Sequence, residues 1–332
     1  MGEVLERPIV VLVDHLDEAE GGGLAPTSAQ LLTLARSLTT GGVVAVAPVD
    51  SPDLATLGEQ GAARVLAPDL AGRSSRVPAV LADAVEGAVA EVEDPAAVLV
   101  ASDYRGREVA AVLAVRLGGG AVVDAAGVEA EDGALEVRKS AFAGTWATRV
   151  RLTGRVPVIA VRPSSVEARP AAEPSSPEVV RVAVRSSPES LGVELVSSTR
   201  QESTGGVALA DARVVVVGGR GTGGDFGPVR ALADVLGGAV GATRVACDEG
   251  WAPRALQIGQ TGVSVAPRIY IGLGVSGAIH HTVGMQAARR IVAVDDDPDA
   301  PIFDIADFGV VGDLFEVIPQ ALETLRKELG GQ

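Results

Sequence analysis

The chain has 332 residues, of which 47% are hydrophobic and 21% charged, a globular composition long enough for two domains. Its net charge of -15 argues against nucleic acid or an anionic membrane as a partner, because both attract clustered Lys and Arg. The single cysteine, Cys247, excludes an intramolecular disulfide framework and a cysteine-cluster metal site. The chain begins with a short apolar run beside acidic residues rather than a signal peptide, and no stretch reaches the roughly 20 apolar residues of a membrane span. We therefore expect a cytoplasmic protein without membrane insertion.

The first half alternates β-branched runs with helical segments. Strands are predicted to begin near residues 8, 42, 63, 96 and 120, with shorter ones over 135–142, 146–152 and 157–163. Helices are predicted over 27–39, 77–92 and 107–118. Strands alternating with helices predict an α/β, N-terminal Rossmann-like domain with a mostly parallel sheet.

The amino-acid composition changes after residue 161. Residues 162–206 are rich in Pro, Ser and Glu and are typical of a partial linker, although the strand-like run 179–187 can still join the first sheet. We predict domains of 1–207 and 208–332. The second contains strands over 212–219, 241–248, 268–273 and 291–295, and helices over 227–238, 277–290 and 314–329.

A glycine fingerprint marks the second domain. Gly272, Gly274 and Gly277 form G-x-G-x-x-G between a predicted strand and helix, and Asp295 ends the next strand 18 residues after Gly277. This layout is typical of dinucleotide binding, with the phosphates near amides at a helix N-terminus and the acid on a ribose. A second glycine-rich turn, 218–227, favours a long ligand across the sheet's carboxyl edge. The alternative is a tight turn without a ligand.

The spacing of residues argues against two further hypotheses, a metal site and a hydrolase nucleophile. His280 and His281 are helix neighbours that project about 100° apart, so they do not share a face for a metal ion, and we expect no metal site. Ser276 lacks the G-x-S-x-G context of a hydrolase nucleophile, and we assign no catalytic residue.

Several segments resemble the alpha subunit of electron transfer flavoproteins. They are "VVVVGGRGTGG", "VGATRVACDEGW", "QIGQTG", "RIYIGLGVSGAIHHTVGMQ" and "DPDAPIFDIADFGVVGDLF", in matching order between residues 214 and 315. The resemblance implies that residues 208–332 form an FAD-binding domain of the DHS-like NAD/FAD-binding type.

The resemblance also implies the contacts of the cofactor. Arg220 is expected beside the flavin or its phosphates, and Arg244, which follows Thr243, on the isoalloxazine face. Asp295, Asp313 and Leu314 are expected at the nucleotide end. Two segments are expected to wrap the flavin and the pyrophosphate, with the Thr261 hydroxyl near flavin N5 and His281 at the N1/O2 side: Ile258, Gly259, Gln260 and Thr261; Ser276, Gly277, Ala278, Ile279, His280 and His281.

These residue types suit a redox flavin. A cation about 4 Å from the reduced ring contributes roughly 4 kcal/mol at an effective dielectric near 20, equivalent to roughly 170 mV. Two positions depart from the family pattern, His280 in place of Gln and Asp295 in place of Asn, so we expect a divergent member.

The implied function is that of an electron-carrier subunit with no substrate of its own. It binds FAD and pairs with a beta subunit that carries AMP or a second FAD. Electrons arrive from flavin dehydrogenases, such as the acyl-CoA dehydrogenases of fatty acid beta-oxidation, and leave to a quinone reductase or another acceptor. The alternatives are an NAD-dependent oxidoreductase that uses Gly272–Gly277 and a flavin-free assembly partner.

Overall fold

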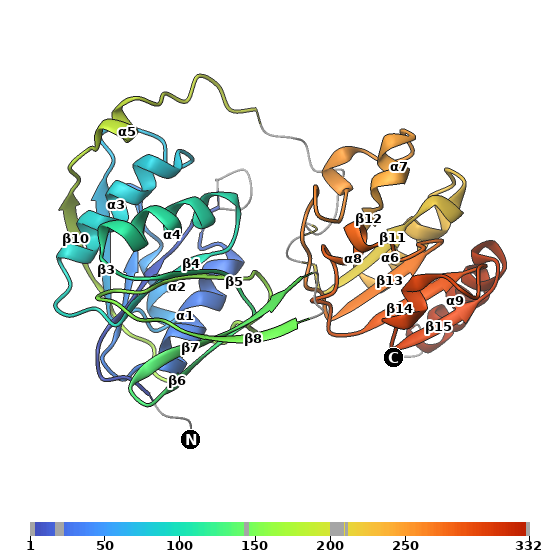
Figure 1. Ribbon diagram of the computed structural model, residues 1–332, viewed down its shortest axis with the longest axis horizontal. Coiled ribbons are helices and arrows are strands. Elements are labelled where there is room, and N and C mark those ends of the chain that lie inside the picture. The colour runs from blue at the N-terminus through green and yellow to red at the C-terminus, as the bar shows by residue number, and fades with distance from the viewer. Residues whose placement is uncertain (1–3, 17–22, 143–145, 200–208, 210–211, 330–332) are drawn as a thin grey trace. The chain divides into compact units, whose positions relative to one another are not determined.

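The computed structural model describes residues 4–16, 23–142, 146–199, 209 and 212–329. The chain divides into two compact units, Met1–Arg200 and Gln201–Gln332, and each is α/β (Figure 1). The predicted boundary between residues 207 and 208 lies outside the described residues, and it stays a prediction.

The first unit is built on a seven-stranded, all-parallel sheet in the order β10-β3-β2-β1-β4-β9-β5. Its strands are β1 Ile9–Leu12, β2 Val43–Val46, β3 Arg64–Asp69, β4 Ala97–Ala101, β5 Ala121–Ala125, β9 Val158–Val161 and β10 Glu178–Ala183. A three-stranded antiparallel sheet is formed by β6 Gly127–Glu131, β7 Ala134–Ala141 and β8 Trp146–Arg151. The helices are α1 Pro26–Leu38, α2 Leu54–Glu59, α3 Pro78–Ala90, α4 Tyr104–Arg116 and α5 Pro188–Leu191.

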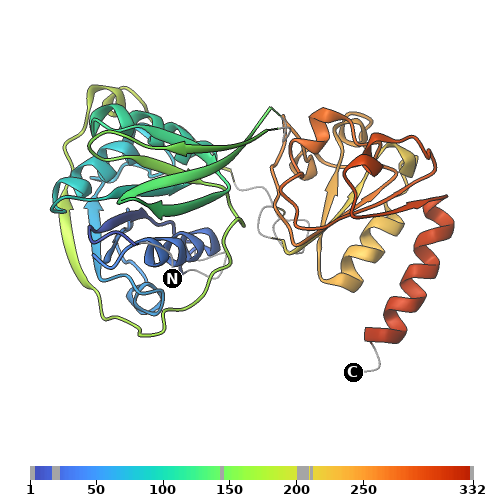
Figure 2. The same ribbon diagram turned by 60° about the horizontal axis from the view of Figure 1, so that its bottom comes forward.

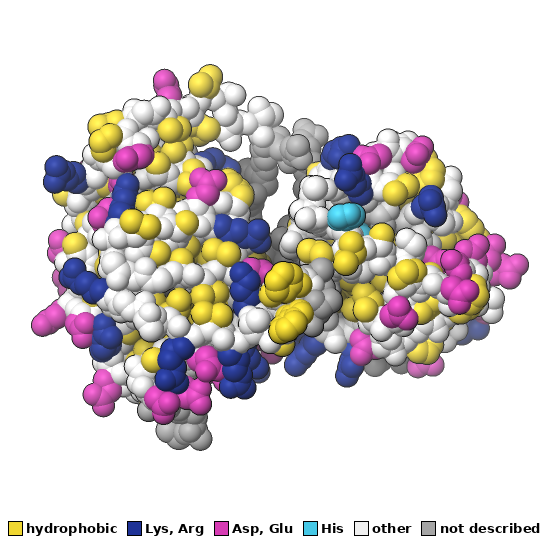
Figure 3. Space-filling model, in the orientation of Figure 1, with side chains coloured by type: hydrophobic (Ala, Val, Ile, Leu, Met, Phe, Trp, Pro, Cys, Tyr) yellow, Lys and Arg dark blue, Asp and Glu magenta, His cyan; other side chains and the backbone are white. Residues whose placement is uncertain are grey.

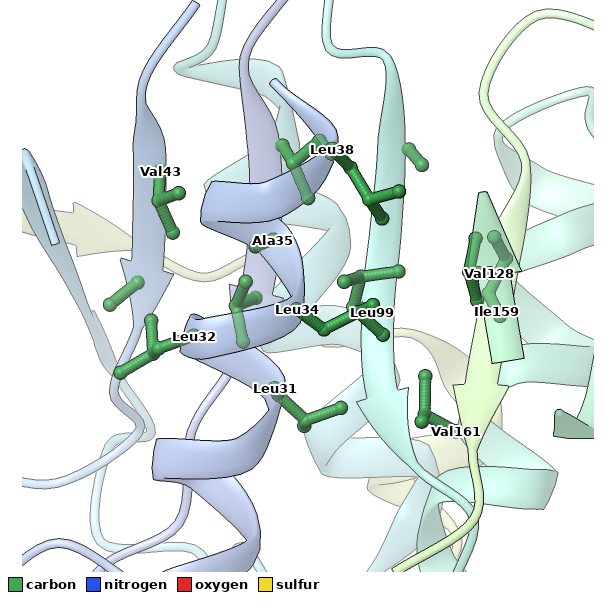
Figure 4. Close-up of a cluster of buried hydrophobic side chains, with 14 of the residues drawn as sticks. Leu31, Leu32, Leu34, Ala35, Leu38, Val43, Leu99, Val128, Ile159 and Val161 are labelled. Atoms are coloured by element: carbon green, nitrogen blue, oxygen red, sulfur yellow. The ribbon is translucent and has the colours of Figure 1, made fainter. Parts of the chain in front are cut away.

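Helices cover both faces of this sheet because its inner strands, such as β1, β2 and β9, are apolar and buried at every residue. The α1 side chains Leu31, Leu34 and Leu38, at helical spacing, pack with Leu99 and Ile159 on one face (Figure 4). The other face packs against α3 and α4. Such continuous burial is what a parallel sheet between helix layers requires.

The predicted Rossmann-like domain is confirmed, with three local differences. The predicted strand at residue 120 is divided into β5 and β6, because Asp124 has a φ of 61° and the register shifts there. The short helices α2 and α5 were not predicted. Much of the Pro/Ser-rich segment is held to the unit: Ala171 N donates to Glu59 O, Ser175 N donates to Gly58 O, and β10 pairs with β3.

The second unit contains a five-stranded, all-parallel sheet in the order β12-β11-β13-β14-β15. Its strands are β11 Val214–Gly218, β12 Ala239–Ala242, β13 Ile269–Leu273, β14 Ile291–Asp295 and β15 Phe308–Val311. Its helices are α6 Gly227–Leu236, α7 Arg244–Asp248, α8 Ile279–Thr282 and α9 Leu314–Leu329, with 3-10 turns η2 Arg220–Thr222, η3 Arg254–Leu256 and η4 Pro301–Asp304.

The two faces of this second sheet are covered differently. Helices α6 and α9 lie side by side on one face (Figure 2). On the other face, Tyr270 and Val217 pack with Ile258, Val265 and Met285, which come from irregular segments.

Two predicted elements of the second unit are corrected. The predicted strand 241–248 ends at Ala242, and Thr243 caps the helix α7, with its side chain accepting from Ala246 N. The predicted helix 277–290 is a single turn, α8, because Gly284 packs its backbone against Gly259, where a Cβ would lie 2.4 Å from Gly259 N. Beyond α8 the chain continues in turns to Ala288, with Gly284 N donating to His281 O and Ala288 N donating to Met285 O.

Candidate cofactor site at a switch point

The second sheet reverses its strand order between β11 and β13, and this is where doubly wound sheets bind ligands, at the carboxyl ends of the strands. Every strand of the sheet is followed by residues that the sequence predicted for the site. Arg220 follows β11, Thr243 and Arg244 follow β12, the segment Ser276–His281 follows β13, Asp295 ends β14, and Asp313 follows β15. The parallel topology therefore brings segments from across the predicted domain to one edge.

The two glycine turns at this edge contact each other through their backbones. A Cβ at Gly219 would lie 2.1 Å from Gly274 O, and one at Gly274, whose φ is 61°, would lie 2.6 Å from Gly221 Cα. Gly219 N donates to Leu273 O and Gly221 N donates to Gly274 O. These glycines are thus explained by the close approach of two turns, and their amides are already occupied.

Amide donors remain further along the glycine turn that follows β13. Of the residues that the structure describes, none accepts a hydrogen bond from the backbone N–H groups of Ser276, Gly277 or Ala278. Ser276 and Ala278 are exposed, whereas Gly277 has a φ of 83° and its Cα faces Ile302, where a Cβ would lie 2.3 Å from Ile302 N. Three successive amides without acceptors can donate to an anionic group.

The predicted segment Ile258–Thr261 lies against α8. Gln260 N donates to His280 O at 2.8 Å, and Gln260 Oε1 lies 2.7 Å from His280 Nδ1. The Thr261 hydroxyl accepts from Gln257 Nε2 at 2.9 Å, which leaves its own proton free to be donated. Gln260, Thr261, Ile279 and His280 are exposed, so this pair of segments forms a polar surface with one apolar side chain.

The two histidines have different surroundings, because His281 is buried and His280 is exposed. His281 is only 6% exposed, with Nδ1 lying 3.0 Å from Ile258 O and Nε2 lying 2.7 Å from Tyr270 Oη. Burial lowers the pKa of His281 to about 4, so the ring is neutral at pH 7. His281 would have to exchange one of these partners to reach the flavin N1/O2 side, and the histidine that faces solvent is His280.

Positive charge at the edge comes from two exposed arginines. Arg244 Nε lies 3.3 Å from Asp248 Oδ2, and Asp248 also pairs with Arg254 at 2.6 Å. Arg220 forms no ion pair with any described residue. The Asp248 carboxylate therefore reduces the field of Arg244, an effect that the sequence-based estimate did not include.

The acidic candidates differ in burial. Asp295 is 8% exposed and accepts a hydrogen bond from Asp297 N, and burial raises the pKa of its carboxyl. Asp313 is exposed and accepts from Phe315 N at the start of α9, whereas Leu314 is buried in the core beneath that helix.

Two polar residues at the site were missed by sequence reasoning, Tyr270 and Asp248. Tyr270 sits in an apolar strand, where nothing marks its hydroxyl, and Asp248 is the i+4 neighbour of Arg244, a spacing that could have indicated the pair. Among the described residues, no three His, Cys, Asp or Glu side chains are grouped so as to hold a metal ion. In the same part of the chain, no helix is long and apolar enough to cross a bilayer.

This fold and edge define an α/β protein of the class that binds a nucleotide-containing cofactor at a switch point. Comparison with known families agrees. The family model "Electron transfer flavoprotein domain" matches residues 13–187, and "Electron transfer flavoprotein FAD-binding domain" matches residues 208–286.

Two relatives match over nearly the full length of the chain. The chain is 41% identical to the electron transfer flavoprotein subunit alpha of Mycobacterium leprae (strain TN) and 42% identical to that of Mycobacterium tuberculosis (strain H37Rv), in both cases over 97% of this chain and 99% of the relative. It is 56% identical to the mitochondrial subunit alpha of Arabidopsis thaliana over 35% of this chain and 33% of the relative. The chain belongs to the electron transfer flavoprotein alpha-subunit family, and its function is electron transfer.

Proposed function

We propose that the second unit binds FAD across the carboxyl edge between β11 and β13 and that this cofactor carries the transferred electrons. The observation that supports this most is the gathering of exposed donors at the switch point. They are the amides of Ser276 and Ala278, the guanidinium groups of Arg220 and Arg244, and the polar pair Gln260 and His280.

The residues fit FAD in two parts. The amides after β13 and the Arg220 guanidinium suit the pyrophosphate, because they are donors beside a sheet edge. Gln260, Thr261, Ile279 and His280 suit the isoalloxazine ring, which needs both hydrogen bonds and an apolar contact. FAD supplies the redox chemistry, since no side chain of the protein accepts and returns electrons in this way. The cation Arg244 favours the reduced, negatively charged ring.

An NAD-dependent oxidoreductase is less well supported. Such an enzyme needs an acid or base that activates its substrate, and of the two histidines at this edge His281 is buried between Tyr270 and Ile258. Gly274 is the fingerprint glycine that would let a pyrophosphate approach the backbone, and here it packs against Gly221 instead. The flavin-free assembly partner remains the alternative, and the flavin content of the purified complex distinguishes it from the proposed function.

The proposed partner is a beta subunit that carries AMP or a second FAD, in a heterodimer located in the cytoplasm. The proposed electron donors are flavin dehydrogenases, such as the acyl-CoA dehydrogenases of beta-oxidation, and the acceptor is a quinone reductase or a similar protein. The family membership supports these assignments, and the chain makes or breaks no substrate bond itself. Asp and Glu side chains gather toward the β15 and α9 end of the second unit, so a docking protein there would be basic (Figure 3).

The test is to co-express the chain with its beta subunit and record the absorption spectrum of the purified complex. We expect a flavin spectrum and one FAD per alpha subunit beyond any FAD held by the partner alone. NADH is expected to give no protection against thermal unfolding. A complex that assembles but takes up no flavin with FAD in excess would contradict the proposal and favour the assembly partner.

A further inference from the structure

We infer that Tyr270 is a positioning residue of the flavin site, acting through His281 on the segment 257–263. This inference rests on the proposed FAD site and extends it beneath the surface. Tyr270 is fully buried in β13, and its hydroxyl lies 2.7 Å from His281 Nε2. Among the described residues, Tyr270 is the one residue of β13 whose side chain forms a hydrogen bond with His281.

The hydrogen bonds define the state of the imidazole. A carbonyl oxygen only accepts, so His281 Nδ1 must carry a proton to bond Ile258 O at 3.0 Å. Burial keeps the ring neutral, so Nε2 carries no proton and accepts from the Tyr270 hydroxyl. The chain of donors therefore runs from Tyr270 through His281 to Ile258 O, and it selects one tautomer.

The two adjacent histidines join α8 to the same segment from two sides. His281 holds Ile258 on the buried side, and His280 holds Gln260 on the exposed side through its carbonyl and its ring. Gly259 lies between them, with a φ of 143° and no room for a Cβ, which would lie 2.6 Å from His280 O. The buried bonds thus fix the orientation of the exposed Gln260 and Thr261.

The fingerprint glycine Gly272 makes room for this tyrosine. A Cβ there would lie 3.1 Å from Tyr270 Cε1 and 3.4 Å from Tyr270 Oη. An alanine would therefore require the tyrosine ring to shift by a few tenths of an ångström. The first glycine of the motif serves the hydroxyl beneath the site, whereas Gly274 serves the contact between turns.

The experiment uses the complex of the full chain with its beta subunit, labelled with ¹⁵N-histidine. The alpha chain has only three histidines, His15, His280 and His281, so their imidazole signals can be assigned with single variants. In the wild type we expect His281 to carry its proton on Nδ1 and to resist protonation down to about pH 4. Tyr270 and His280 are the titratable neighbours of this ring on β13 and α8.

The variant Tyr270→Phe removes only the hydroxyl. We expect it to change the His281 tautomer populations and to weaken FAD binding about tenfold, the loss typical of a buried acceptor left without its donor. Tyr104→Phe removes the other tyrosine hydroxyl, which is exposed in the first unit, and is expected to change neither readout. Gly272→Ala provides a second perturbation of the same hydroxyl if Tyr270→Phe fails to fold.

Three results would overturn the inference. One is a wild-type His281 protonated on Nε2, and another is a His281 that titrates near pH 6.5. The third is a Tyr270→Phe protein with a lower melting temperature but unchanged FAD affinity and tautomer, which would make the hydroxyl a core group only. If the wild type binds no FAD, the proposed function fails, and the tautomer readout still decides whether Tyr270 orients His281.

Discussion

Both units have a parallel sheet whose strand order reverses, but the polar side chains at the carboxyl edge are treated differently. In the first unit they pair with one another, whereas in the second unit they are exposed. The first sheet also reverses its order, between β1 and β4, and charged residues follow its strands there. Arg105 pairs with Asp14 at 2.9 Å, and Arg162 donates two hydrogen bonds to Asp124, at 2.9 and 2.7 Å. Asp124 N in turn donates to Ser102 Oγ.

At the second edge, by contrast, Arg220, Arg244, Gln260 and His280 are exposed, and the amides of Ser276–Ala278 have no acceptor among the described residues. A switch point provides a location for a ligand, and the side chains decide whether protein groups already occupy it. Substitutions confined to one edge separate these two cases.

The largest effect is expected from Gly274→Ala. The new Cβ would lie 2.6 Å from Gly221 Cα at a positive φ, so overpacking and backbone strain add to about 3 kcal/mol or more. The loss of stability is measured by urea unfolding in a Trp146→Phe background. Trp251 is then the only tryptophan, so the tryptophan signal reports on the second unit alone.

Gly223→Ala is the matched control for that measurement. It also has a positive φ, 56°, but nothing lies within 4 Å of its Cβ, so about 1 kcal/mol is expected. Equal costs for the two variants would show that the contact between the glycine turns contributes nothing.

Arg105→Ala tests the filled edge of the first unit. It leaves the Asp14 carboxylate, 26% exposed, without its nearest cation, and we expect a loss of about 2 kcal/mol. Arg7→Ala breaks an exposed pair with Asp94 and is expected to cost less than about 1 kcal/mol. FAD affinity should be unchanged in both variants, and a weaker affinity in Arg105→Ala would mean that the two edges are coupled.

Arg244→Ala and Asp248→Asn test the charge at the open edge. The Arg244 side chain is 63% exposed and paired, so solvent screening reduces its effect from the fully effective value to roughly 1 kcal/mol, or about 40 mV. We expect the flavin potential to fall by this amount in Arg244→Ala and to rise in Asp248→Asn, as measured by dye-coupled redox titration. Shifts of the same sign in both variants would contradict an electrostatic origin.

The smallest effect is expected from Asp295→Asn. Burial raises the pKa of Asp295, so the folded state favours the neutral acid and is destabilised at neutral pH relative to an amide. The variant should be more stable by about 1 kcal/mol or less at pH 7. The gain should vanish as the pH falls below the unfolded pKa of about 3.9, where both side chains are neutral. Denaturant midpoints from pH 3 to pH 8 measure this, and a gain independent of pH would indicate packing instead.

The sequence correctly predicted those helices and strands whose apolar residues repeat with a single helical or strand period. The strands of the first unit other than β6, and the helices α1, α3, α4, α6 and α9, were found near their predicted positions. The pattern failed over residues 241–248 and 277–290, on either side of the correctly predicted strand β13. There Thr243 caps a helix inside a predicted strand, and the contact of Gly284 with Gly259 replaces a predicted helix by turns.

The candidate site shows the same division. Which segments meet at the carboxyl edge of the second sheet, from Arg220 to Asp313, was readable because glycine turns and polar residues follow apolar strands. The direction of each side chain was not, since His280 and His281 are identical residues at adjacent positions. One faces Gln260 at the surface and the other Tyr270 in the core.

The amino-acid sequence by itself determined two α/β units, the family and the segments that follow each strand, because periodicity and motif order are properties of the chain. Only the tertiary structure decided which edge is filled by ion pairs, which amides lack acceptors and which histidine is buried. Those outcomes depend on contacts between residues far apart in the chain, and local patterns carry no information about them.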